Sequence, residues 1–185
     1  PAAAAKESKM EALRDLVTRL MPKLADRVLQ FHDDHAEEIV VARGSSHNHQ
    51  AWIGGYQDHI VQCLTLAEEH YPPLDSYPLV RMPFKLSQAA LVLYFHDIEK
   101  IFKYGMKTEK YHPKQISDKN IWYYGIIPEK YDIHFSDDEL NALEYVHGEH
   151  DYVGTERKMW PLAAFCHCVD VMSARIFHDI KVLRF

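Results

Sequence analysis

The stretch Leu91-Val-Leu-Tyr-Phe-His-Asp-Ile-Glu-Lys100 places an imidazole and a carboxylate side by side within an apolar helical run. Burying adjacent polar groups among Leu, Val, Tyr and Phe side chains costs several kcal/mol unless something compensates them. A metal ion is the natural compensation, because histidine nitrogen and aspartate oxygen are both good ligands for divalent metals. The pair His96-Asp97 therefore raises the question of whether the rest of the chain supplies the missing ligands.

The composition is that of an ordinary globular domain, with 185 residues, 47% hydrophobic and 26% charged. A net charge of −6 disfavours a protein that coats nucleic acid non-specifically, since such proteins carry a basic footprint. No apolar run approaches the ~20 residues that cross a bilayer, and the N-terminus has no hydrophobic signal core. Three cysteines, an odd number, argue against a disulfide framework. We therefore expect a cytoplasmic protein without a membrane partner.

Helical periodicity dominates the chain, and glycine is scarce. The apolar spacing predicts helices over 6–21, from Pro22 to Ile39, over 56–70 with an end at Pro72-Pro73, over 86–103, and over 158–178. Ser136 and Glu139 form a capping-box pattern that predicts one more helix start. Residues 105–135 are rich in Tyr, Lys and Pro with weak periodicity, so we interpret them as a long ordered insertion that caps a site.

These elements predict one all-α domain spanning 1–185, a bundle of about six or more helices. N-terminal helices occupy 1–46 and a core occupies 47–178.

Three of the predicted helices carry polar residues toward the core. His59 lies early in the helix of 56–70, and Asp170 lies inside the last helix. Together with His96 and Asp97 they offer two imidazoles and two carboxylates, which can close around one ion and leave open positions for water and substrate. The alternative is a set of core polar residues satisfied by hydrogen bonds.

The order of these residues, H, then HD, then D on successive helices, resembles the HD-domain metal-dependent phosphohydrolases over roughly residues 47–178. His49-Gln-Ala-Trp-Ile-Gly-Gly-Tyr-Gln-Asp-His59 is similar to the HHAYxGGLxEH segment of the HD domain in YhaM-type 3′–5′ exoribonucleases. The segment that begins at His147-Gly-Glu is similar to HGExxxG of that branch, and His167 and Asp170 match its HxxDxxxA segment.

The chain departs from the family at two points. Glu99 stands where the usual HDIGK motif has glycine, and 185 residues leave no room for the RNA-binding OB domain of YhaM-type proteins. Many small single-domain HD proteins are instead nucleotidases or deoxynucleoside triphosphate hydrolases. The resemblance implies an HD-type helical bundle with His59, His96, Asp97 and Asp170 as metal ligands.

Further residues are candidates for contacts with substrate. Lysines beyond the His-Asp pair can meet phosphate as point charges, and an exposed tryptophan can stack on a base. The candidates are Lys100, Lys103, His49, Trp52, His150 and His167. A solvated or purely structural role is the alternative for each of them.

Phosphate ester hydrolysis at neutral pH needs a nucleophile stronger than water, which a metal-bound water provides. Asp97 is expected to be a ligand that also orients this water. His147 is our first candidate for protonating the leaving oxygen and Glu99 the second. The metal is one of Mn, Fe, Co, Ni, Mg or Zn, and one ion is favoured over two.

The expected function is therefore a metal-dependent phosphohydrolase of (deoxy)nucleotides, of the nucleotidase or dNTP triphosphohydrolase type. The nearest alternative is a 3′–5′ exonuclease or phosphodiesterase on short single-stranded nucleic acid. An HD-type di-iron oxygenase would need further ligands, for which His112, His134, His147 and His150 are available. A binding module without activity and a homodimer also stay open.

Overall fold

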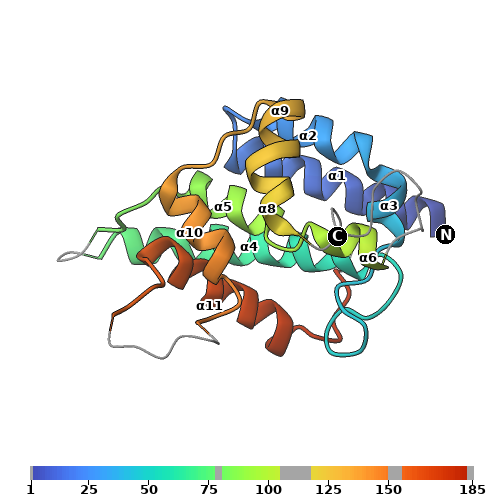
Figure 1. Cartoon of the computed structure of the whole chain (residues 1–185). Helices are drawn as coiled ribbons and strands as arrows, with labels where there is room; N and C mark the ends of the chain where they lie inside the picture. Colours follow the sequence, from blue (N-terminus) through green and yellow to red (C-terminus); the bar gives the residue numbers. More distant parts are fainter. Residues whose placement is uncertain (1, 78–80, 105–117, 150–155, 183–185) are drawn as a thin grey trace.

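The structure is a computed structural model, and it describes residues 2–77, 81–104, 118–149 and 156–182. Within these ranges the protein is helical and contains no strand, which confirms the all-α prediction (Figure 1). The elements are α1 (Ala2–Leu20), α2 (Ala25–Asp34), α3 (Ala36–Val41), α4 (Gly55–Asp75), α5 (Leu86–Phe95), α6 (Glu99–Tyr104), α8 (Lys119–Ile121), the π-helix η1 (Trp122–Ile126), α9 (Ile127–Tyr131), α10 (Asp137–Tyr145) and α11 (Pro161–Ile176). No described helix is both long enough and apolar enough to cross a membrane.

Helices α4 and α5 form the centre of the bundle. Each packs against the other, and both contact α1 and α11, while α10 contacts α5 and α11 (Figure 1). Residues 89–95 of α5 are all buried, so this helix is apolar on every side, as expected of a central helix. The metal-ligand candidates on α4 and α11 thereby come to lie next to the end of α5.

The His-Asp pair lies in a turn rather than inside one helix over 86–103, so this prediction was wrong. Helix α5 ends at Phe95 and α6 begins at Glu99. The carbonyl of Phe95 accepts a hydrogen bond from the Tyr123 hydroxyl (3.0 Å), and the carbonyl of His96 accepts one from Lys119 Nζ (3.0 Å). These outside donors satisfy carbonyls that a continuous helix would have used, which allows the chain to turn.

Two other helix boundaries also differ from the prediction. The predicted helix from Pro22 to Ile39 is two helices separated at His35, and the first of them begins at Ala25. Pro72 and Pro73 do not end α4, because both lie near its last turn, where few N–H groups are lost; the carbonyl of Pro72 still accepts from the N–H of Ser76 (2.9 Å).

Two helix starts follow the sequence pattern. Ser136 and Glu139 form the predicted capping box of α10, with the Ser136 N–H donating to Glu139 Oε2 at 2.7 Å. Helix α11 begins with Pro161, where the missing N–H has no cost, and covers most of the predicted 158–178.

Part of the predicted insertion over 105–135 lies outside the described residues, namely 105–117. The part from 118 onward is helical through Tyr131 and belongs to the core, because Trp122 is fully buried. Its ring stacks on Phe102 with 4.7 Å between the ring centroids.

Candidate metal centre

Four side chains from α4, α11 and the turn after α5 converge on one point, and we call them the metal centre: His59, His96, Asp97 and Asp170. Nε2 of His59 lies 3.3 Å from Nε2 of His96, 3.5 Å from Oδ2 of Asp97 and 3.2 Å from Oδ1 of Asp170. Nε2 of His96 lies 3.3 Å from the same Asp97 oxygen and 3.6 Å from the same Asp170 oxygen. Ligand atoms about 2.1 Å from a tetrahedral ion are roughly 3.4 Å apart, so this spacing fits a ligand shell.

The metal centre is buried and contains two carboxylates. His59, His96 and Asp97 have no exposed surface, and Asp170 has 7%. Oδ2 of Asp97 forms an ion pair with the ammonium group of Lys100, and Oδ1 lies 3.2 Å from Nε2 of His147. Burying two carboxylates is costly, and a cation within the ligand shell would offset part of this cost.

The two imidazoles of the metal centre have pKa shifts in opposite directions. Burial lowers the pKa of His59 to about 4. Burial also opposes the charged form of His96, but the carboxylates of Asp97 and Asp170 outweigh it and raise the pKa of His96 to about 10. Burial opposes ionisation of Asp97, yet His96 and Lys100 hold the pKa of its carboxyl well below the usual range. The carboxylates thus hold a proton on His96 where a cation would lie.

Both imidazoles are oriented so that Nε2 faces the centre. Nδ1 of His96 donates to the carbonyl of Leu93 at 2.8 Å, and Nδ1 of His59 lies 2.9 Å from the hydroxyl of Ser173. An outer partner of this kind fixes the ring and directs Nε2 toward the centre. A metal bound there would take the place of the proton that the carboxylates hold on His96.

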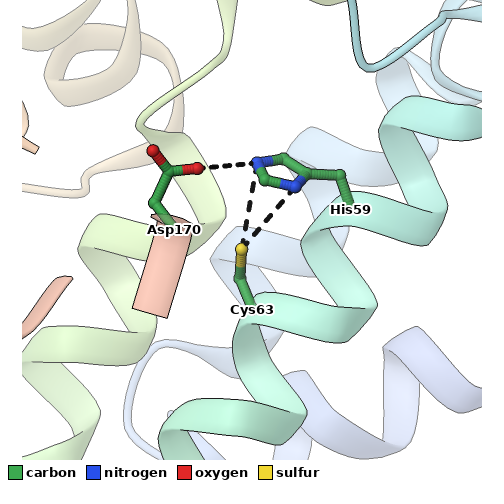
Figure 2. Close-up of side chains that lie close together, drawn as sticks. All are labelled: His59, Cys63 and Asp170. Atoms are coloured by element: carbon green, nitrogen blue, oxygen red, sulfur yellow. Dashed lines mark hydrogen bonds and ion pairs between the residues drawn. The ribbon is translucent and has the colours of Figure 1, made fainter. Parts of the chain in front are cut away.

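The sequence analysis missed the thiol of Cys63, which lies beside His59 (Figure 2). Its Sγ is 3.8 Å from both ring nitrogens, and Cys63 forms a group with His59 and Asp170 that could hold a metal ion. Burial raises the pKa of this thiol, so it stays protonated at neutral pH. The signal that could have revealed it is the spacing of four residues from His59, which places both on one face of α4.

His147 and Lys100 lie against Asp97, as the sequence analysis expected of residues near the site. Nε2 of His147 is 3.2 Å from Asp97 Oδ1, and its side chain is 39% exposed, so this is the open side of the metal centre. Burial opposes the charge of Lys100, but Asp97 outweighs it and raises the pKa of the ammonium group. With His96 and Asp170, His147 forms another group that could hold a metal ion.

The loop before α4 brings His49 to the metal centre. The ring centroids of His49 and His59 are 5.2 Å apart, in agreement with the expectation that His49 lines the site. Gly55 is required at the start of α4, because a Cβ there would lie 1.8 Å from the carbonyl oxygen of Gln50. Gly54 has a positive φ of 79°, which glycine adopts without strain.

Trp52 has a contact within the protein, and its expected contact with substrate stays a prediction. Its indole N–H donates to Oδ2 of the buried Asp58 at 2.8 Å. The other oxygen of Asp58 forms an ion pair with Lys9 of α1 at 2.5 Å. Through Asp58, Trp52 therefore connects the loop to α4 and α1.

Glu99 and Lys103 do not join the metal centre. Oε1 of Glu99 lies 3.8 Å from Nζ of Lys119, and Lys103 is exposed on α6. The carboxylate at the position where the resembled family has glycine is thus directed to α8 and not to His147.

His167 faces a neighbouring backbone, and His150 lies outside the described residues. Nδ1 of His167 donates to the carbonyl of Val146 at 2.6 Å, directly before His147 in the chain. The contact places His167 as a support for the segment that carries His147.

No protein-family model matches this chain, and neither a curated protein nor a solved structure matches it significantly. The functional argument therefore depends on the geometry and chemistry of the metal centre.

Proposed function

We propose that this chain is a metal-dependent phosphohydrolase of (deoxy)nucleotides, with a ligand set of the HD type. The observation that carries the proposal is the convergence of two imidazole nitrogens and two carboxylate oxygens from three parts of the chain, with neighbours 3.2–3.6 Å apart. The burial of Asp97 and Asp170 beside both imidazoles supports the same conclusion. His59, His96, Asp97 and Asp170 would hold the ion.

A divalent ion in such a site lowers the pKa of a bound water to about 7 and neutralises charge on a phosphoryl group. The residues of the chain have separate tasks around it. Asp97 presents Oδ2 to the ligand set and Oδ1 to His147, so it connects the ligand set to the open side. Lys100 adds a positive charge beside Asp97, where it can bind a phosphate oxygen.

His147 is the proposed proton donor to the leaving oxygen. It is the partly exposed histidine that contacts Asp97, so it can reach both the site and the solvent. A general acid must lie within hydrogen-bond reach of the group that it protonates. The former second candidate, Glu99, contacts Lys119 and is not part of this proposal.

The described residues do not favour di-iron chemistry. His134, one of the extra histidines that it would require, is on the surface, with Nε2 3.1 Å from Asp132 Oδ1. His112 and His150 lie outside the described residues. We therefore retain hydrolysis, with mononucleotides as the substrate and short oligonucleotides as the competing class.

The test supplies the metal-free protein with Mn²⁺ and, in separate reactions, a dNTP, a dNMP and a labelled single-stranded oligonucleotide. We expect phosphate or triphosphate release from a mononucleotide, and no release by the Asp97→Asn variant. Shortening of the oligonucleotide alone would overturn the mononucleotide proposal, and no hydrolysis of any substrate would overturn the phosphohydrolase itself.

A further inference from the structure

A chain of hydrogen bonds runs from His59, on the side away from the metal centre, to a backbone carbonyl near the C-terminus. Nδ1 of His59 lies 2.9 Å from Ser173 Oγ, which lies 2.8 Å from Gln62 Oε1. Nε2 of Gln62 lies 2.6 Å from the carbonyl oxygen of Ile180. This series of hydrogen bonds thus connects α4, α11 and the segment that follows α11.

The carbonyl oxygen of Ile180, at the far end of this series of hydrogen bonds, determines which group donates in each of them. A backbone carbonyl only accepts, so Gln62 must point its NH2 group at Ile180 and its Oε1 at Ser173. The Ser173 hydroxyl then donates its one hydrogen to Gln62 and must accept from His59. His59 therefore carries its hydrogen on Nδ1, and Nε2 keeps the lone pair that a metal needs.

The side-chain amide of Gln50 determines the tautomer of the neighbouring His49 in the same way. Nε2 of Gln50 donates to Gln62 Oε1 (2.8 Å) and to the carbonyl oxygen of Ser173 (3.1 Å). Its Oε1 therefore faces Nδ1 of His49, at 2.6 Å, and accepts from it. Gln50 is fully buried, so this orientation is held by the protein and not by solvent.

We propose that Ser173, Gln62 and Gln50 are positioning residues that lock His59 in the tautomer with a bare Nε2, and that they thereby set the metal affinity of the site. The inference rests on the metal centre of the proposed function and not on its substrate. Each of the three residues acts through an imidazole. Loss of such an outer partner costs about 10–100-fold in metal affinity.

The test measures the ring tautomers of the metal-free protein by ¹⁵N NMR and its Mn²⁺ affinity by calorimetry. Wild type should show His59 protonated on Nδ1. Ser173→Ala should give a mixed tautomer at His59 and about 10–100-fold weaker Mn²⁺ binding, while Ser173→Thr, which keeps the hydroxyl, should restore both. Gln62→Met is the second variant, and it should also produce a mixed tautomer.

Thr65→Ala is the matched control, because Thr65 is also on α4 but its hydroxyl bonds only the carbonyl of Val61 in its own helix (2.8 Å). It should change neither the tautomer nor the affinity. A wild-type tautomer and affinity in both Ser173→Ala and Gln62→Met would overturn the inference. If wild type has the Nδ1–H tautomer and binds Mn²⁺ but hydrolyses no nucleotide, the proposed function fails and this inference stands.

Discussion

In the part of the chain that the structure describes, two pairs of histidines are buried, and the pairs differ in what their ring nitrogens face. In the metal centre, the Nε2 atoms of His59 and His96 lie 3.3 Å apart and face carboxylates. In the N-terminal pair, His32 and His35, Nδ1 of His32 lies 3.0 Å from the Tyr94 hydroxyl and Nε2 of His35 lies 3.3 Å from the Tyr131 hydroxyl.

Burial alone therefore does not distinguish a ligand from a core histidine. The N-terminal pair meets neutral hydroxyl groups and aromatic rings, and the ring of His35 lies 4.7 Å from that of Phe31 between centroids. No cation is required there. In the metal centre, two ring nitrogens and two carboxylates share one small space, so a positive charge is needed to hold them together. Four experiments, each with a variant or a change of conditions, test this difference between the two environments.

The largest effect is expected from Asp97→Asn, which removes the charge that both imidazoles of the metal centre face. Metal binding should weaken by more than the ~100-fold expected for an outer partner, and turnover should be abolished. Metal content by mass spectrometry and nucleotide hydrolysis measure both effects. His32→Gln, which changes the N-terminal pair, should keep the metal and the activity; loss of metal in that variant would break the distinction between the pairs.

His147→Ala should separate proton transfer from metal binding. We expect turnover to fall about 10²–10⁴-fold, the usual contribution of a general acid, because this histidine lies on the open side of Asp97. Mn²⁺ affinity should change little, since the four ligands of the metal centre remain. Steady-state kinetics with parallel calorimetry tests this, and equal losses of affinity and turnover would make His147 a ligand instead.

Metal addition should stabilise the fold through the metal centre only. A ligand at 100 times its Kd contributes about 2.7 kcal/mol, which for a chain of this size corresponds to a rise in Tm of roughly 5–10 °C. Scanning calorimetry with and without Mn²⁺ should show this rise for wild type and His32→Gln. Asp170→Asn should show little or none, and a full rise in that variant would place the ion elsewhere.

The smallest expected effect is on the pH dependence of the free energy of unfolding, through His32 of the N-terminal pair. Burial lowers the pKa of His32 to about 4, from about 6.5 in an unfolded chain. Between these values the unfolded chain binds a proton that the folded protein does not, so stability falls as the pH decreases from 6.5 toward 4. The loss should be about 2 kcal/mol between pH 7 and pH 5.

His32→Gln should lack this part of the pH dependence in urea unfolding experiments at saturating Mn²⁺. An unchanged pH profile in the variant would show that His32 is not held neutral by burial.

The apolar spacing of the sequence was sufficient for the helical class, and the Ser136–Glu139 pattern and Pro161 were sufficient for the starts of α10 and α11. It was insufficient for the turn at His96-Asp97, because that turn depends on Tyr123 and Lys119, which donate to its carbonyls from a distant part of the chain. Periodicity describes which face is apolar and cannot report a donor that tertiary packing supplies.

For the site, the four residues that the sequence analysis placed on apolar helices are the ones that converge. Cys63, Gln62 and Ser173 were missed, although each lies three or four positions from His59 or Asp170, on the same helix face. The contact of the Trp52 indole with Asp58 was also missed. The group that an indole N–H contacts depends on the geometry of its loop, and the spacing of residues in the sequence does not predict that geometry.

The most direct test of the account is a crystal structure of the protein soaked with Mn²⁺, with the ion located by its anomalous signal. The account predicts one peak about 2.0–2.3 Å from Nε2 of His59, Nε2 of His96 and oxygens of Asp97 and Asp170. A fully loaded crystal with the peak at another place, or with no peak among these four side chains, would contradict it.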